Sequence, residues 1–273
     1  MSDDAATAAR EAAVARFVAL AFQAGPEGPP LDEAALEIAA AAAPLPDPRA
    51  AASAELDRLA DGVEDLPGLV RRLYGEEGFA GDTVDYGDPR NSSLAQVLRR
   101  RRGIPVTLAV VAVAVGRRAG VLLHPVGMPG HFLVRPDGED PSGRHLDPFT
   151  GRMVDLAGVE ALFRASTGAG PGVPFGPEYL PVLDVESVLV RMLANLRAGH
   201  RRTGRLDELR WVLEMRLALG GVEAAEVLEL AEARGRRAEY GPAARLLEAW
   251  AQRLPSDAAR LRRTARSWRA HLN

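Results

Sequence analysis

One histidine and one aspartate are the residues of this chain best placed to do chemistry together. His131 opens a short apolar run in P-G-H-F-L-V-R, and Asp147 follows 16 residues later in H-L-D-P-F. An aspartate on a neighbouring strand can fix the tautomer of a histidine, which leaves the second ring nitrogen to act as a general base or acid. His131 and Asp147 are therefore a candidate catalytic pair. The same spacing also fits a hydrogen-bonded pair with a purely structural role.

The chain offers no conventional covalent nucleophile beside this pair. It contains no cysteine, which excludes a thiol nucleophile, thiolate metal ligands and disulfides together. It also contains no lysine, so all 34 basic residues are arginines and Schiff-base chemistry is excluded. Thr107 carries the hydroxyl nearest the start of the apolar helix that is expected to begin at Pro105. We expect this hydroxyl to bond within its own helix.

A metal site is the alternative that the histidines leave open. His145 and Asp147 are two residues apart, so on a strand they project to one face, and His131 and His124 can lie near them. The sequence has no dense ligand motif such as H-E-x-x-H and no glycine-rich phosphate loop. We therefore expect neither a metal ion nor a cofactor.

A buried helix and a small sheet must position the candidate pair. Pro105 suits the first position of a helix, and residues 106–115 are apolar nearly all round, which predicts a helix buried on every side. Gly120 fits the position just after the end of this helix. Short apolar runs predict three strands of an antiparallel sheet packed against it, at residues 121–126, 131–135 and 144–147.

The segment before the central helix holds a further polar candidate and an arginine run. Asn91, in D-P-R-N-S, is either a turn residue or an amide donor that faces the site. Ser92 or Ser93 can cap a helix that ends near Gly103, with four arginines, residues 99–102, in its last turn. Because arginines there meet the negative end of the helix dipole, a solvated charge cluster is favoured over a binding site for an acidic partner.

Helices are expected over most of the remaining chain. Capping residues and apolar spacing predict helices at residues 5–23, 32–43, 48–62 and 155–165. Residues 75–82 are rich in glycine and acid, so we expect an irregular loop that closes over the core through Phe79. The Gly/Pro-rich residues 167–177 are the best linker candidate, which predicts two domains, 1–177 and 178–273.

The sequence of the second domain predicts repeated helices. Shifting the chain by 34 residues places apolar residues on one another: Leu193 on Val227, Leu196 on Leu230, Leu206 on Tyr240, Val212 on Leu246 and Leu213 on Leu247. This period is typical of tetratricopeptide repeats, which are paired helices that bury one face by stacking. The sequence therefore predicts two diverged repeats and a closing helix at residues 257–271.

The composition is that of a soluble globular protein. Hydrophobic residues make up 47% of the 273 residues and charged residues 26%, and the net charge of -3 argues against a general binder of nucleic acid. Residues 12–24 are apolar, but Arg16 interrupts the run and two aspartates precede it, which predicts an amphipathic helix and no secretory signal. No other segment approaches the roughly 20 apolar residues that cross a bilayer, so we expect a cytoplasmic protein.

Several ordered motifs give the chain a resemblance to a known family. D-P-R-N-S, R-R-G-I-P-V-T-L, P-G-H-F-L-V-R and D-P-F-T-G, with L-Y-G-E-E-G-F upstream and R-M-L-A-N-L downstream, resemble the SirB-type branch of transglutaminase-like proteins, which are bacterial. The resemblance covers about residues 55–255 and includes the tetratricopeptide-like region. It implies an α+β, mostly helical fold with a papain/transglutaminase-like core.

The resemblance also implies roles for individual residues. In active members a cysteine at the start of the central helix attacks an amide carbonyl, a histidine activates it and an aspartate orients the histidine. His131 and Asp147 match the second and third positions, whereas Pro105 occupies the nucleophile position, so thiol transglutaminase or protease activity is excluded. Asn91 remains a candidate amide donor.

Two functional hypotheses follow from this pattern. The first is a non-catalytic protein with a regulatory or protein-interaction role, which binds a protein or peptide through the core pocket and the helical repeats. The second is a hydrolase that acts on an amide or ester bond through His131 and Asp147 with a non-thiol nucleophile. Neither hypothesis requires a metal, a cofactor, nucleic acid or a membrane.

Overall fold

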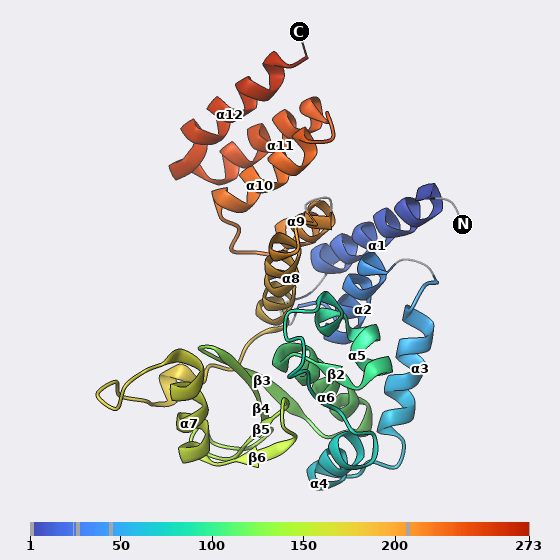
Figure 1. The fold of residues 1–273 in the computed structure, drawn as a ribbon, viewed down its shortest axis with the longest axis vertical. Coiled ribbons are helices and arrows are strands. Elements are labelled where there is room, and N and C mark those ends of the chain that lie inside the picture. The colour runs from blue at the N-terminus through green and yellow to red at the C-terminus, as the bar shows by residue number, and fades with distance from the viewer. Residues whose placement is uncertain (1–2, 24, 26–27, 44–45, 206–207, 273) are drawn as a thin grey trace. The chain divides into compact units, whose positions relative to one another are not determined.

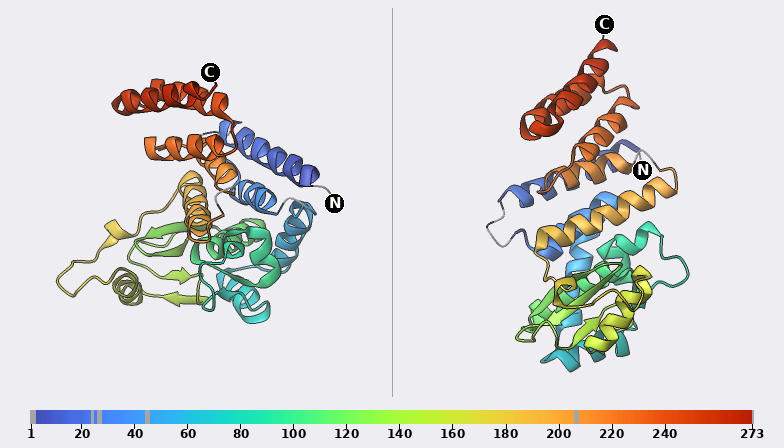
Figure 2. Two further views of the ribbon diagram at one scale, coloured as in Figure 1. Left: turned by 45° about the horizontal axis from the view of Figure 1, so that its top comes forward. Right: turned by 90° about the vertical axis from the view of Figure 1, so that its left-hand side faces the viewer.

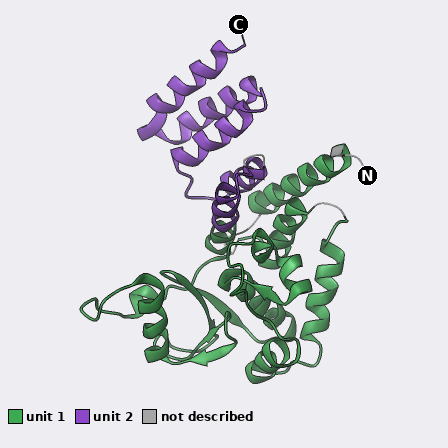
Figure 3. Ribbon diagram, in the orientation of Figure 1, with its two compact units in different colours: residues 1–192 green, residues 193–273 purple. Residues whose placement is uncertain are grey.

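The protein is mostly helical, with a small antiparallel sheet, as the sequence predicted. A computed structural model describes residues 3–23, 25, 28–43, 46–205 and 208–272 (Figure 1). The chain forms two compact units, Met1–Met192 and Leu193–Asn273, called unit 1 and unit 2 below (Figure 3). Within the described residues no helix is both long and apolar enough to cross a membrane.

Unit 1 begins with three helices rich in alanine, α1 (Asp3–Gln23), α2 (Leu31–Ala42) and α3 (Arg49–Ala60). A short helix, α4 (Leu66–Val70), and a π-helical turn, Arg71–Glu76, follow them. The small side chains of α2 are almost all buried, which lets neighbouring helices approach closely. Asp65 caps α4 by accepting a hydrogen bond from the backbone N–H of Gly68 at 2.7 Å. These helices surround the centre of unit 1.

The centre of unit 1 is α6 (Pro105–Ala119), the helix that the sequence predicted. Pro105 stands at its first position, where a missing N–H costs no hydrogen bond, and Gly120 ends the helix with a φ of 75°. Its residues are buried from Pro105 to Ala112 without a break. At Gly116 a side chain would clash, because an added Cβ would lie 2.5 Å from the carbonyl oxygen of Val121. The helix is therefore fixed at both ends and closely packed.

The sheet beside α6 is a four-stranded antiparallel meander. Its strands are β3 (Leu123–Met128), β4 (His131–Pro136), β5 (His145–Asp147) and β6 (Arg152–Val154), in that order. The first three match the predicted strands to within two residues at each end, and β6 was not predicted. The sheet packs against α6 and α7 (Leu156–Thr167), which lie beside it in each view (Figures 1 and 2). Buried side chains of β3 and β4, among them Val126 and Leu133, meet Val159 and Phe163 of α7.

The segment that leads into α6 differs from the prediction. Helix α5 (Leu94–Arg100) ends at Arg101, which adopts a left-handed conformation with a φ of 59°, and not at Gly103. The backbone of β2 (Arg102–Gly103) instead pairs in parallel with β1 (Ala80–Gly81), so the end of the predicted loop 75–82 is a short strand. Phe79 is 3% exposed and does close over the core. The guanidinium of Arg101 lies 4.8 Å from the centre of the Phe79 ring, which helps to hold this conformation.

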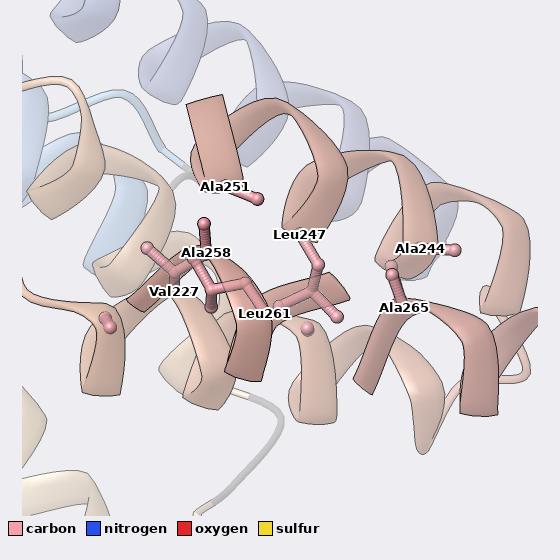
Figure 4. Close-up of a cluster of buried hydrophobic side chains, with 10 residues drawn as sticks. Val227, Ala244, Leu247, Ala251, Ala258, Leu261 and Ala265 are labelled. Atoms are coloured by element: carbon pink, nitrogen blue, oxygen red, sulfur yellow. The ribbon is translucent and has the colours of Figure 1, made fainter. Parts of the chain in front are cut away.

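Unit 2 consists of helices packed in sequence. It takes in the end of α8 (Val185–Arg202) and the helices α9 (Leu209–Leu217), α10 (Ala224–Gly235), α11 (Tyr240–Arg253) and α12 (Ala258–Ala270). A capping box formed by Glu223 and Glu226 starts α10. Small and branched residues of α10, α11 and α12 form one apolar cluster, with Leu247 and Leu261 at its centre (Figure 4). The closing helix was predicted at residues 257–271, close to its observed bounds.

Candidate functional site

The structure brings His131 and Asp147 together. Strands β4 and β5 pair with Val134 opposite Leu146, and this antiparallel register places Leu133 opposite Asp147. His131 is two residues before Leu133, so it lies on the same face of the sheet, diagonally across from Asp147. Nε2 of His131 lies 2.9 Å from Oδ1 of Asp147, a hydrogen-bond distance. The carboxylate is almost completely buried, and 13% of the histidine side chain is exposed. The candidate pair is thus formed and is nearly enclosed.

Asp147 also organises the turn that follows β5. Its Oδ1 accepts a hydrogen bond from the backbone N–H of Phe149 at 3.0 Å, and its Oδ2 accepts one from the hydroxyl of Thr150 at 2.6 Å. Burial acts to raise the pKa of Asp147, but the hydrogen bonds from His131, Thr150 and Phe149 outweigh it and leave the pKa below its usual value. The carboxylate is therefore held in its ionised form.

The role of Thr150 was missed in the sequence. An aspartate followed by a backbone N–H two residues on and a hydroxyl three residues on is the pattern of an Asx turn. D-P-F-T-G carries this pattern, so the turn could have been found without the structure. Gly151 completes it with a φ of 74°, and an added Cβ there would lie 2.3 Å from the ring of Tyr74. Burial, followed by the charge of Asp147, raises the pKa of the Tyr74 hydroxyl.

The second ring nitrogen of His131 is left available. Nδ1 forms no hydrogen bond with any described residue, whereas Nε2 is held by Asp147. The His131 ring meets the ring of Phe149 edge to face, with centres 6.4 Å apart. Phe149 in turn lies against Gly81, where an added Cβ would be 2.1 Å from the ring. Since Gly81 pairs with Gly103, two residues before Pro105, these contacts connect His131 to the start of α6.

Pro105 and Thr107 supply no nucleophile at the start of α6. Pro105 is buried at the first helical position and has neither a reactive side-chain atom nor a backbone N–H. Thr107 is fully buried, and its hydroxyl has no hydrogen-bond partner among the described residues. The expectation that this hydroxyl bonds within its own helix is therefore wrong. Its burial also leaves no route by which a bulk-solvent substrate could reach it in this conformation.

Asn91 is built into the structure beside the site. Its side chain is fully buried, its Nδ2 donates to the carbonyl oxygen of Asp85 at 2.7 Å, and its Oδ1 accepts from Arg100 at 2.9 Å. The backbone carbonyl of Asn91 accepts from the N–H of Ile104, the residue that precedes α6. This geometry favours the turn interpretation, in which Asn91 fixes the approach of the chain to α6.

Arg100 ties this segment together. Besides Asn91 it contacts Asp82 at 3.0 Å and Asp88 at 3.8 Å, and both aspartate side chains are about nine-tenths buried. The next residue, Arg101, pairs with Glu55 and Glu77. The predicted solvated cluster at residues 99–102 is therefore wrong for these two arginines, because acids that lie far away in the sequence neutralise them.

A short loop exposes apolar side chains next to the site. Val84 is 96% exposed and Tyr86 is 57% exposed, although both are apolar or aromatic. The ring of Tyr86 lies 6.4 Å from that of Phe149, which also meets His131. No sequence pattern singled out this loop, since its residues acquire their significance only through the fold.

The two other histidines considered as metal ligands, His124 and His145, form no site with His131. His124 pairs with Asp137 at 2.8 Å at the exposed end of the β3–β4 hairpin. His145 is fully buried, with Nδ1 3.1 Å from the carbonyl oxygen of Gly143, and burial lowers the pKa of its imidazole. Within the described part of the chain, no three His, Cys, Asp or Glu side chains are arranged to hold a metal ion.

Comparison with known proteins places this geometry in a family. Residues 31–194 match the transglutaminase-like superfamily. A UPF0162 protein of Pseudomonas aeruginosa is 36% identical over 216 residues, which cover 73% of this chain and 76% of that protein. A UPF0162 protein of Xylella fastidiosa is 39% identical over 146 residues, and there the alignment spans only about half of each chain, 52% of this one and 51% of the relative.

A eukaryotic protein shares the same region. Human F-box only protein 21 is 33% identical over 152 residues, which are 54% of this chain and 24% of that protein. No solved structure matches this chain. The superfamily match includes α6, the sheet and the His131–Asp147 pair, and the Pseudomonas relative is covered over three quarters of its length. The chain therefore belongs to the transglutaminase-like superfamily and, within it, to the UPF0162 proteins.

Proposed function

We propose that this chain is a SirB-type transglutaminase-like protein that performs no catalysis and acts by binding or regulating a protein partner. One observation carries the proposal, namely that Pro105 occupies the first position of α6, where an active member has its cysteine. The chain has no cysteine elsewhere that could take over the role. The superfamily membership supports the position that we assign to Pro105.

Proline at this position removes two parts of the expected machinery. It lacks the thiol that would attack the carbonyl, and it lacks the backbone N–H that a residue at a helix N-terminus can offer to an oxyanion. An oxyanion donor contributes about 10²–10³ in rate in acyl-transfer enzymes. His131 and Asp147 would then remain as a structural pair that holds the turn after β5 to the sheet.

A domain that acts by binding can form the core of one protein and a part of a larger one. The region shared with human F-box only protein 21 makes up 24% of that protein, so it occurs there as one part of a larger chain. In this chain we propose that residues 178–273 are tetratricopeptide-like repeats, as the period of 34 predicts, and that their stacked helices present a surface to the partner. The exposed Val84 and Tyr86 beside His131 fit a second contact with the same partner.

A hydrolase is the alternative, and one observation favours it. Nδ1 of His131 has no partner among the described residues and could activate a water molecule. Assays of the purified protein with activated esters and with glutamine amide donors distinguish the two functions, with His131→Gln as the matched variant. We expect both proteins to match the buffer rate. Turnover that disappears in His131→Gln would contradict the proposal and establish the hydrolase.

A further inference from the structure

The last helix of unit 2 has two opposite faces. Ala258, Leu261 and Ala265 recur at helical spacing and are buried against α10 and α11 (Figure 4). The other side carries four exposed arginines, which we call the α12 arginine face: Arg260, Arg262, Arg263 and Arg266. The spacing of these positions places the four guanidinium groups on one continuous half of the helix. The face therefore presents a band of positive charge.

This positive charge is not neutralised within the structure. None of the four arginines forms an ion pair or hydrogen bond through its guanidinium with a described residue. Elsewhere in unit 2, arginines on α8 to α10 are paired, for example Arg197 with Glu229 at 2.5 Å and Arg234 with Glu214 at 3.0 Å. On α12 itself, Arg269 pairs with Glu248. Arg245 and Arg253 of α11 also form no ion pair with a described residue, but α12 gathers four such arginines on one face.

Keeping these arginines lowers the stability of α12. Arg260 lies in the first turn, where the positive end of the helix dipole repels a cation. Arg262 and Arg266 are four residues apart and repel each other by a few tenths of a kcal/mol. Sequences tend to break such local rules where a function requires it. The unfavourable placement points to a role outside the fold of the chain itself.

A groove borders the arginine face. Its volume is about 280 Å³, and Arg260 lines it together with Leu209, Leu228 and Ala233, all from unit 2. The two glutamates at its edge, Glu229 and Glu232, are already paired with arginines. The groove can therefore hold an apolar side chain of a ligand whose acidic groups meet the arginines beside it.

The charges of the two units point to an acidic partner. Unit 2 has 16 arginines and 10 acidic residues, a formal net charge of +6, whereas unit 1 has 18 arginines and 27 acidic residues, a net charge of -9. We propose that the α12 arginine face and its groove bind an acidic, amphipathic helical segment of a partner protein. The inference rests on the proposed interaction function and specifies the chemistry of the partner.

A protein helix fits this surface better than nucleic acid does. The arginines recur at intervals of three and four residues, the spacing at which a helix laid alongside presents its own glutamates or aspartates. The apolar groove has a natural ligand in a leucine or similar side chain of such a helix. A long polyanion needs many phosphate contacts for tight binding, and this face offers four arginines.

The test uses the full chain and a defined probe. Fluorescence anisotropy measures binding of a fluorescein-labelled helical peptide made of Glu, Leu and Ala, with Leu on one face and Glu on its flanks. The test variant is Arg262→Gln/Arg263→Gln/Arg266→Gln. The control variant, Arg71→Gln/Arg99→Gln/Arg144→Gln, removes the same charge from exposed arginines of unit 1. Thermal unfolding of both variants confirms that each is folded.

The expected result is binding that weakens with added salt, because exposed ion pairs are screened. We expect the test variant to lose about tenfold or more in affinity and the control variant to lose little. No binding by the wild type, or equal binding by the two variants, would overturn the inference. Tighter binding of single-stranded RNA through the same arginines would overturn it in favour of nucleic acid. None of these outcomes depends on turnover, which tests the proposed function separately.

Discussion

Two groups of arginines in this chain look alike in the sequence and differ in the structure. In unit 1, Arg100 and Arg101 belong to a run of four arginines before α6, and both form ion pairs with acids of other segments. In unit 2, the α12 arginine face has the same number of arginines within seven residues, but its guanidinium groups have no acidic partner among the described residues. The first group is built into the fold, and the second is exposed on the surface.

Whether an arginine is neutralised by an acidic side chain decides whether it stabilises the fold or stays available for binding. Arg100 satisfies the buried Asn91 and Asp82, so its charge holds together the segment that leads to the candidate site. Such a residue is expected to contribute to stability, because its loss leaves buried polar groups without a hydrogen-bond partner. An unpaired surface arginine contributes little to stability and remains available for binding. Substitutions in the two regions should therefore have opposite consequences for folding and for association.

The largest expected loss of stability follows from replacing Arg100. Arg100→Ala removes the donor to Oδ1 of the buried Asn91 and to Oδ2 of Asp82, whose Oδ1 keeps two backbone donors, so we expect the free energy of unfolding to fall by about 2–4 kcal/mol. Arg99→Ala is the matched control, because Arg99 is exposed and bonds only Gln96 within its own helix. Urea unfolding measures both. An equal loss of stability at the two positions would contradict the proposed difference between paired and unpaired arginines.

The next effect concerns the candidate pair itself. Asp147→Asn replaces a carboxylate that accepts hydrogen bonds from His131, Phe149 and Thr150 with an amide that cannot accept all three. His131→Ala leaves the same carboxylate without one donor. We expect either change to lower the free energy of unfolding by roughly 1–3 kcal/mol, measured by thermal or urea unfolding. Unchanged stability in both variants would contradict a structural role for the pair.

The pH dependence of stability sharpens this result. The pKa of Asp147 is lower in the folded protein than its reference value of 3.8, so folding favours the ionised carboxylate. Its contribution is complete above that reference value and is lost as the pH falls through the lowered pKa. The stability difference between the wild type and Asp147→Asn should therefore narrow below about pH 4. If the stability difference between the two proteins widened on acidification, the pKa of Asp147 would be raised by folding and not lowered.

The smallest expected change in stability is on α12, where a substitution should stabilise the protein. Arg262→Gln removes repulsion with Arg266, four residues on, and breaks no ion pair with a described residue. We expect the free energy of unfolding to rise by about 0.2–0.5 kcal/mol at low salt and the gain to shrink as salt is added. A clear loss of stability would show that this arginine, like Arg100, has a structural partner.

The sequence predicted the elements whose residues carry their own signals. The start of α6 at Pro105, its end before Gly120 and its uniform burial follow from local patterns, and the pairing of His131 with Asp147 was expected from two strands joined by a turn. The left-handed Arg101 could not be predicted, because the residues that support it, Glu55 and Glu77, lie 46 and 24 positions away. Strand β6 has three residues, too few for a periodic pattern.

The most direct test asks whether Pro105 stands at a nucleophile position that His131 still serves. Pro105→Cys would introduce the only thiol of the chain, so the pH dependence of its alkylation by iodoacetamide gives its pKa without interference. We predict a thiol pKa clearly below the ordinary value of about 8.5, and a rise towards that value when His131→Gln is added. A thiol with an ordinary or raised pKa, unaffected by His131, would contradict the assignment of the site.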